Sequence, residues 1–156
     1  MMKIEIIKSV GYGRTAIGAF DNALCNAGVA NFNLFKLSSV IPEKCREIEE
    51  VKKYRRKLAH GDKLYCIYSS NIGKDVEAGI AYDRETKDGL GVFVEESGEN
   101  EDVVKKMLNT SLDDLFLSRE WSKDANNRHE FVVSARANEG LACALAIAVL
   151  KEEGWG

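Results

Sequence analysis

Polar residues interrupt apolar stretches of this sequence at three sites, and the first of these residues is Asp21. On a helical wheel it falls between Ile17, Leu24 and Gly28, inside the stripe that a helix here should bury. An unpaired buried carboxylate costs roughly several kcal/mol. Asp21 therefore caps a neighbouring backbone, lies at the edge of the stripe, or contacts a cationic ligand.

The other two sites, Asn33 and the pair Ser38 and Ser39, lie in the apolar segment Asn31–Ser39. Asn33 stands in the middle of this segment, where a structural hydrogen bond is the usual explanation. The pair Ser38 and Ser39 ends the segment just before Pro42, and serines at the end of a strand are commonly turn residues. The residue types alone permit chemistry at these positions and do not require it.

Familiar catalytic and nucleotide-binding motifs are absent. There is no G-x-x-x-x-G-K-[ST], and the G-Y-G-R-T that begins at Gly11 is too short for the dinucleotide fingerprint. The sequence also lacks H-x-x-x-H, G-x-S-x-G and a plausible Cys-His pair. These absences argue against kinases, nucleotide hydrolases and dehydrogenases.

Composition predicts one globular domain over residues 1–156, with 45% hydrophobic residues and a net charge of -3. This charge argues against a dedicated nucleic-acid binder. The basic run at residues 52–57 follows Glu47, Glu49 and Glu50, so we expect a solvated helix face rather than a phosphate site.

Cysteine spacing and hydropathy predict the compartment. The four cysteines form no C-x-x-C pair, so we expect reduced thiols and no metal site in a cytoplasmic protein. The longest apolar run, Leu141–Leu150, is too short to cross a bilayer, and Glu5 interrupts the apolar N-terminus. We therefore expect no membrane segment and no secretion signal.

Periodicity predicts the elements of the first half of the chain. Lys3–Val10 is expected to be a strand that ends in a turn at residues 11–13, and residues 17–28 a helix stopped by Gly28. The segment 31–39 is apolar on both faces, which favours a strand covered on two sides. A charged helix is expected over Glu49–Leu58, with Val51, Tyr54 and Leu58 facing inward.

The second half combines strands with one strongly amphipathic helix. That helix contains the apolar stripe Val103–Phe116, with Asn100 as N-cap. Leu141–Leu150 is apolar all round and fits a buried helix or a buried strand equally well. The expected strands are Lys63–Ser70, Val76–Tyr82, Leu90 to Glu95 or Glu96, and His129–Arg136. Two sets of strands with two or three amphipathic helices predict a layered α+β sandwich.

A continuous string, FNLFKLSSVIP over residues 32–42, follows D-N-A-L-x-x-A-G over residues 21–28. With these motifs the chain resembles the pyruvoyl-dependent arginine decarboxylase family. The resemblance extends to a later G-x-x-x-E strand and to the apolar C-terminal segment, and it covers the chain from about Ile4 to Leu150. The N-terminal block is its specific part, and the later matches are looser.

The resemblance implies that the chain makes its own cofactor. The Ser39 hydroxyl would attack the carbonyl of Ser38, and the chain would be cut into residues 1–38 and 39–156. Ser39 would become a covalent pyruvoyl group, and no other cofactor would be needed. Arginine would form a Schiff base with this group and lose CO₂ to give agmatine.

Roles for further residues also follow from the resemblance. Glu95 matches the general acid of the family, although Glu96 is a local rival. Asp21 matches the acidic contact to the guanidinium group of the substrate, and Ser38 is expected beside it as a second substrate contact. Asn33 matches a polar residue that orients the scissile carbonyl or stabilises the developing oxyanion.

The implied fold is a four-layer αββα sandwich in which Leu141–Leu150 is an interior strand. The implied assembly is a homotrimer or a dimer of trimers with sites between subunits, acting on arginine. The charge balance and the short apolar runs separately predict that the chain binds neither nucleic acid nor membrane. Two alternatives stay open. One is a pyruvoyl decarboxylase of another amino acid such as histidine, and the other is an unprocessed homologue that only binds a metabolite.

Overall fold

The computed structural model describes residues 2–55, 57 and 59–156, which form two β-sheets and two α-helices. The strands of the five-stranded sheet are, in spatial order, β2 (Asn33–Lys36), β5 (Lys63–Gly73), β9 (Leu141–Glu153), β1 (Lys3–Gly13) and β4 (Glu47–Glu50). Those of the four-stranded sheet are β3 (Val40–Ile41), β7 (Gly91–Gly98), β6 (Asp75–Arg84) and β8 (His129–Arg136). The helices are α1 (Ala16–Ala27) and α2 (Glu101–Ser118), with a short 3₁₀ turn at Ala125–Asn127.

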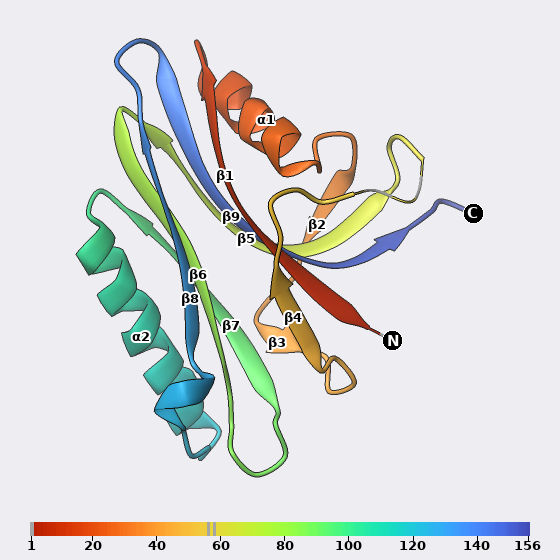
Figure 1. The fold of residues 1–156 in the computed structure, drawn as a ribbon, viewed down its shortest axis with the longest axis vertical. Helices are drawn as coiled ribbons and strands as arrows, with labels where there is room; N and C mark the ends of the chain where they lie inside the picture. Colours follow the sequence, from red (N-terminus) through yellow and green to blue (C-terminus); the bar gives the residue numbers. More distant parts are fainter. Residues whose placement is uncertain (1, 56, 58) are drawn as a thin grey trace.

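The layers follow the order helix, sheet, sheet, helix (Figure 1). Helix α1 packs on the five-stranded sheet, α2 packs on the four-stranded sheet, and the two sheets face each other. The predicted four-layer αββα sandwich is therefore confirmed. Neither helix has the length and apolar character needed to cross a membrane, within the part of the chain that the structure describes.

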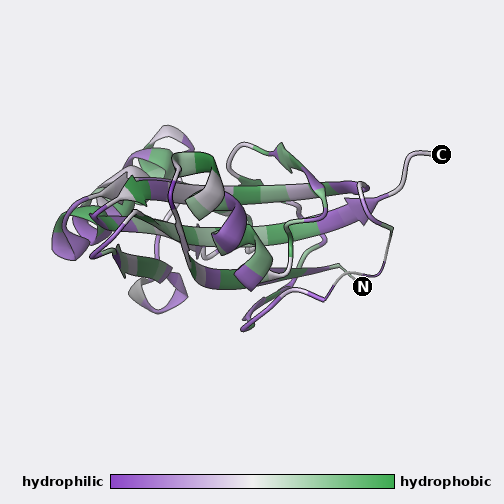
Figure 2. Cartoon of the chain, turned by 90° about the horizontal axis from the view of Figure 1, so that it is seen from above, coloured by the Kyte–Doolittle hydropathy of each residue, from purple (hydrophilic) through white to green (hydrophobic). Residues whose placement is uncertain are grey.

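Strand β9 resolves the ambiguity of the C-terminal apolar run. It lies between β5 and β1 and pairs antiparallel with both. Its alanines at 142, 144, 146 and 148 face the other sheet, whereas Cys143, Leu145, Ile147 and Val149 pack on the side of α1. Small and large side chains therefore alternate along β9, although all of them are hydrophobic and hydropathy does not distinguish them. Figure 2 shows that hydrophobic residues also recur along the other buried strands.

Helix α1 was predicted nearly to the residue, but its buried face was not. Thr15 accepts a hydrogen bond from Gly18 N at the N-terminus, and Gly28 closes the helix with a φ of 87°. The face against the sheet consists of Ala19, Ala23, Leu24 and Ala27. The expected burial of Ile17 and Asp21 is wrong, because Ile17 is 73% exposed and Asp21 is also exposed.

The glycines after the first predicted strand explain this rotation of α1. The expected turn at residues 11–13 is wrong, because β1 continues to Gly13. A Cβ on Gly11 would lie 2.1 Å from the backbone nitrogen of Ala23, and one on Gly13 would lie 2.4 Å from that of Ala19. The glycines therefore let α1 approach β1 through its alanines, and Ile17 lies on the outer face of the helix.

The charged helix predicted over residues 49–58 is wrong. Residues 47–50 form β4, which pairs parallel with β1 and places Glu47 and Glu49 beside Lys3. The described residues that follow are not helical, although Val51 and Tyr54 pack inward as expected. Arg56 of the basic run and Leu58 lie outside the described residues.

Strand β2 also differs from its expectation. It is an edge strand of the five-stranded sheet, and it is not covered on both sides. Phe35 is 40% exposed and Leu37, just past the strand, is 37% exposed. The other predicted strands and the α2 helix with its Asn100 cap are confirmed, with ends that differ by a few residues. An apolar edge strand thus leads directly to the two serines.

Candidate active site

The serine pair lies where the chain passes from one sheet to the other. Strand β2 belongs to the five-stranded sheet and β3 to the four-stranded sheet, so residues 37–39 cross between them. Leu37 N donates to Cys66 O at 2.8 Å on one side, and Phe93 N donates to Ser39 O at 2.6 Å on the other. The Ser38–Ser39 peptide is therefore anchored at both flanks by different sheets, and lies outside both strands.

A cavity of about 280 Å³ opens beside this crossing. Its walls come from the crossing itself, β5, β7 and α2, with the lining residues Leu37, Ser38, Ser39, Ile67, Phe93, Val94, Glu95, Ser111 and Leu115. Three residues predicted from the sequence, Ser38, Ser39 and Glu95, thus share one cavity. The cavity combines apolar side chains with the hydroxyl and carboxylate groups of Ser38, Ser39, Ser111 and Glu95, a mixture that can hold and orient a small polar molecule.

Strand β7 decides which glutamate reaches the cavity. Glu95 lines it, whereas Glu96 is not among the lining residues. Glu95 Oε1 forms an ion pair with Lys36 Nζ at a distance of 2.8 Å. Its Oε2 is buried and accepts no hydrogen bond from any residue that the structure describes. A carboxylate oxygen with unused hydrogen-bonding capacity therefore belongs to a residue that borders the serine pair.

Lys36 was missed by the sequence reasoning. It is the last residue of β2, and besides Glu95 its ammonium lies 4.6 Å from the centre of the Tyr68 ring. Its signal was present in the sequence, because a single lysine interrupts the apolar run before the serines. Cys66 lies nearby, and burial raises the pKa of its thiol to about 12, so this cysteine stays protonated and is no nucleophile.

Asp21 and Asn33 do not reach the cavity within one chain. Asp21 lies on the exposed face of α1, with Cys25 Sγ 3.9 Å from its carboxylate. Asn33 begins β2 and donates from its side-chain amide to Gly61 O at 2.7 Å, an oxygen that Trp155 also contacts. The amide of Asn33 thus makes the structural hydrogen bond that is usual for such a residue, away from the serines.

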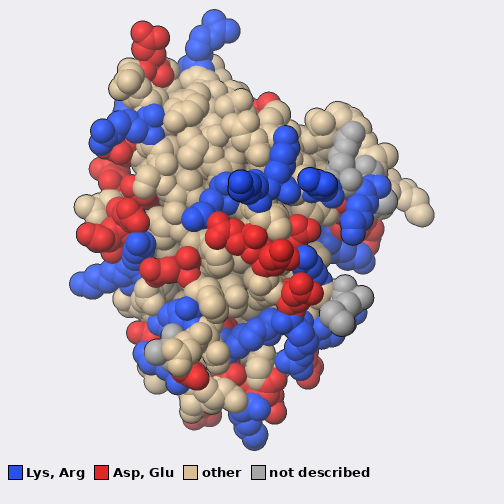
Figure 3. All heavy atoms as spheres, in the orientation of Figure 1, with Lys and Arg blue, Asp and Glu red and all other residues tan. Residues whose placement is uncertain are grey.

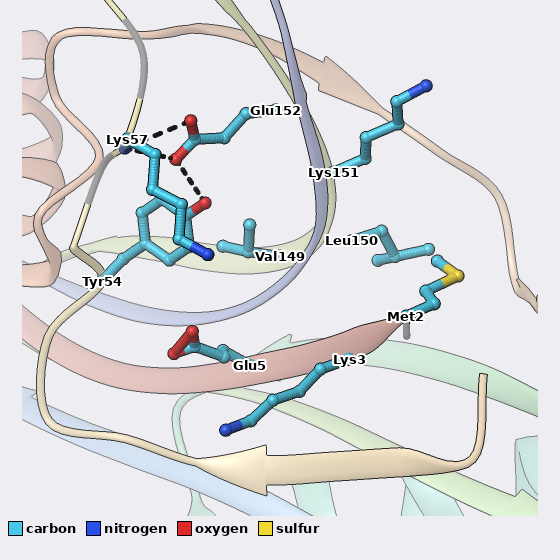
Figure 4. A pocket seen from close by; sticks show the side chains of 9 residues that line it. All are labelled: Met2, Lys3, Glu5, Tyr54, Lys57, Val149, Leu150, Lys151 and Glu152. Carbon is cyan, nitrogen blue, oxygen red and sulfur yellow. Dashed lines mark hydrogen bonds between the residues drawn. The ribbon is translucent and has the colours of Figure 1, made fainter.

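A second cavity, of about 480 Å³, lies where β1 begins and β9 ends (Figure 4). Tyr54 donates its hydroxyl to Glu152, which also accepts from Lys57 N at 3.0 Å. Burial, with this hydrogen bond second, raises the pKa of Tyr54, so the hydroxyl stays protonated. These contacts tie the segment after β4 to β9, and this cavity contains none of the predicted catalytic residues.

Among the described residues, no three histidine, cysteine or acidic side chains are grouped so that they could hold a metal ion. Three of the predicted residues, Ser38, Ser39 and Glu95, meet at the serine cavity.

Comparison with known proteins shows to which family the chain belongs. A sequence model of pyruvoyl-dependent arginine decarboxylases matches residues 3–154. The chain belongs to this family. The similarity to pyruvoyl-dependent arginine decarboxylases is therefore not limited to the serine motif and covers nearly the whole chain.

Individual members of the family give the extent of the similarity. The chain is 33% identical over 102 residues to pyruvoyl-dependent arginine decarboxylase 2 of Archaeoglobus fulgidus, covering 62% of this chain and 64% of that relative. It is 33% identical over 106 residues to the pyruvoyl-dependent arginine decarboxylase of Methanothermobacter thermautotrophicus, covering 65% of this chain and 66% of the relative. With that of Methanococcus vannielii the identity is 28% over 155 residues, covering 94% and 88%. The first two alignments thus span slightly less than two thirds of the relatives.

Proposed function

We propose that this chain is a self-processing decarboxylase that converts L-arginine to agmatine and CO₂. The observation that carries the proposal is the shared cavity of Ser38, Ser39 and Glu95, in a chain of this family. The names of the relatives support arginine as the substrate. A ketone made from the chain itself would supply the electron sink that decarboxylation of an amino acid needs.

Self-cleavage would begin at the peptide that crosses between the sheets. The Ser39 hydroxyl attacks the Ser38 carbonyl carbon, the amide C–N bond breaks, and an ester and a free amine at residue 39 result. Removal of the α-proton of residue 39 then expels the Ser38 carboxylate and leaves dehydroalanine. Its imine form takes up water and releases ammonia, which leaves a pyruvoyl group on the fragment 39–156. The anchors at Leu37 and Ser39 support this step, because they fix both sides of the scissile bond.

The surroundings of Ser39 fit a small ketone. Ser39 is half-buried, its carbonyl is held by Phe93 N, and Phe93 and Ile67 supply apolar walls. The ketone would supply the electron sink, since as a Schiff base with arginine it accepts the electron pair left by departing CO₂. Glu95 then delivers the proton to the α-carbon, a role that suits its Oε2, which accepts no hydrogen bond from the described residues.

Substrate binding would need a second copy of the chain. Asp21 lies outside the cavity of its own chain, and we propose that a neighbour presents it to the guanidinium group in a homotrimer or dimer of trimers. The surface around Asp21 supports such an interface, because Ile17 is 73% and Tyr12 54% exposed. Figure 3 shows a broad area with few charged side chains over α1 and the strands beside it, whereas acidic and basic groups are mixed below this area. Asn33 would join the site only if its amide leaves Gly61.

Intact-mass measurement of purified protein tests the cleavage. We expect fragments of residues 1–38 and 39–156, the second with a blocked keto-acyl end. The variant Ser39→Ala should stay whole and release no CO₂. One uncut wild-type species after prolonged incubation would refute self-processing.

A panel of amino acids tests the substrate. We expect CO₂ release from arginine at a higher kcat/KM than from histidine, lysine or ornithine. An equal or higher kcat/KM for another amino acid would keep the pyruvoyl chemistry and overturn the assignment of arginine.

A further inference from the structure

The ion pair between Lys36 and Glu95 spans the same gap as the serine pair. Lys36 ends β2 in the five-stranded sheet, and Glu95 lies on β7 in the four-stranded sheet. The covalent crossing at residues 37–39 and this 2.8 Å contact are therefore parallel links between the two sheets. One of them is the bond that the proposed self-cleavage removes.

The Lys36 ammonium is itself held in place. It lies 4.6 Å from the centre of the Tyr68 ring, and its backbone neighbour Leu37 is hydrogen-bonded to β5. A lysine fixed at two points can fix the carboxylate that it contacts. Lys36 Nζ contacts Oε1 of Glu95. The other oxygen, Oε2, is buried and accepts no hydrogen bond from the described residues.

We propose that Lys36 is the positioning residue of Glu95, which orients the carboxylate so that its second oxygen serves the reaction beside Ser39. The proposal rests on the proposed function, since it assigns a role within that site. Lys36 contacts Glu95 and, in this assignment, does not contact the substrate.

Cleavage makes this contact more important. Lys36 would belong to the fragment 1–38 and Glu95 to the fragment 39–156, so the ion pair would connect two separate chains. It would then hold the free end of β2, two residues before the new carboxylate of Ser38, beside the cavity. Without it, the end of the strand could move and Glu95 would lose its fixed orientation.

The chain offers a matched control for a substitution of Lys36. Lys63 Nζ contacts Glu153 Oε1 at 2.8 Å and lies 4.7 Å from the centre of the Trp155 ring. None of these three residues lines the serine cavity. Lys36→Met and Lys63→Met therefore remove the same kind of ion pair and the same kind of ring contact. Only the first removal touches Glu95.

The experiment measures cutting by intact mass, kcat and KM for arginine, and thermal unfolding of the wild type, Lys36→Met, Lys36→Arg and Lys63→Met. We expect Lys36→Met to be cut and to lose about 10-fold or more in kcat, with KM changed by less than about 3-fold. Lys36→Arg should restore kcat to within about 3-fold, and Lys63→Met should keep both constants within about 2-fold of the wild type. Unfolding midpoints of the two methionine variants should be similar.

Several outcomes would overturn the positioning role. These are wild-type kcat in Lys36→Met, an equal loss in Lys63→Met, a change in KM alone, or failure of arginine to restore kcat. An uncut Lys36→Met would also overturn it, because Glu95→Gln is expected to be cut and Lys36 would then act on the serine peptide rather than through Glu95. An uncut wild-type protein would instead refute the proposed function itself.

Discussion

Two lysine–glutamate pairs in this molecule have nearly the same local geometry and very different surroundings. Lys36 and Glu95 meet beside the serine cavity, and Lys63 and Glu153 meet at the end of the five-stranded sheet, each at 2.8 Å and each with the lysine over an aromatic ring. The two pairs differ in what else contacts the carboxylate. A single contact distance therefore does not reveal what an ion pair does.

The carboxylate of Glu153 is fully engaged. Its Oε1 also accepts from the Tyr65 hydroxyl at 3.0 Å, and its Oε2 lies 3.3 Å from Lys151 Nζ. Hydrogen bonds, first from Lys63 and then from Tyr65, lower the pKa of Glu153 to about 2. Glu95 receives only Lys36 at Oε1 among the described residues, and Oε2 receives nothing. A saturated carboxylate stays ionised and ties strands together, whereas an unsaturated one keeps capacity for a reacting group.

The largest expected effect separates the two glutamates by catalysis. Glu95→Gln should still be cut and should lose about 10²- to 10⁴-fold in kcat, because the amide cannot deliver a proton. Glu153→Gln should keep the wild-type kcat. Steady-state CO₂ release by the cut proteins measures both, with Glu96→Gln as the neighbouring control. Unchanged turnover in Glu95→Gln together with a loss in Glu96→Gln would move the acid to the neighbouring residue.

The second prediction uses the cut chain to distinguish the pairs, since only Lys36 and Glu95 would then lie on separate fragments. The fragments should nevertheless stay together, because β1 pairs with β9 from Glu5 to Gly13 and buries Ile6 completely. Ile6→Ala should weaken the folded complex by about 2–5 kcal/mol. Size-exclusion chromatography with mass analysis, with and without urea, measures this. Free fragment 1–38 in the absence of urea would contradict the expected association.

The sequence predicts those parts of the fold that depend on residues close together in the chain, and it does not predict those that depend on distant contacts. The strand His129–Arg136 and the cap of α2 at Asn100 were predicted to the residue, because alternation and capping are read from neighbours in the chain. The face of α1 was not, because it is set by contacts with Gly11 and Gly13 of β1. Glu49 and Glu50 were assigned to the start of a helix, because their partners, Lys3 and Lys8, lie on a strand that is distant in the sequence.

The candidate site divides in the same way. Ser38, Ser39 and Glu95 came from the family resemblance, and folding brings them to one cavity. Strand alternation alone could not choose between Glu95 and Glu96. Lys36 was missed because its partner is 59 positions further along the chain, on another sheet. Pairings between sheets depend on the tertiary fold, which no local pattern specifies.

Cys66 gives a smaller effect that reports on the mobility of β2. Its thiol lies 3.9 Å from Phe35 O under this strand, and burial raises its pKa to about 12, so labelling requires the strand to open. In cut protein, Lys36→Met should speed Cys66 labelling by up to about 5-fold, the effect of an exposed ion pair worth up to about 1 kcal/mol. Lys63→Met should have less effect. Peptide mass analysis after alkylation measures the rates, with the exposed Cys25 as internal reference. Equal acceleration in both variants would contradict a special role of Lys36 at β2.

The smallest expected effect is the acid response of Glu153. Its pKa is 4.5 in the unfolded reference and about 2 in the folded protein, so its stabilising contribution is fully present above about pH 4.5 and is lost as the pH falls toward 2. Its side chain is 40% exposed, so solvent screening keeps this contribution small. Thermal unfolding midpoints of the wild type and Glu153→Gln should therefore differ near neutral pH and converge as the pH approaches 2, whereas the exposed Glu99→Gln should track the wild type throughout. A difference between wild type and Glu153→Gln that does not change with pH would mean that Glu153 acts through packing and not through its charge.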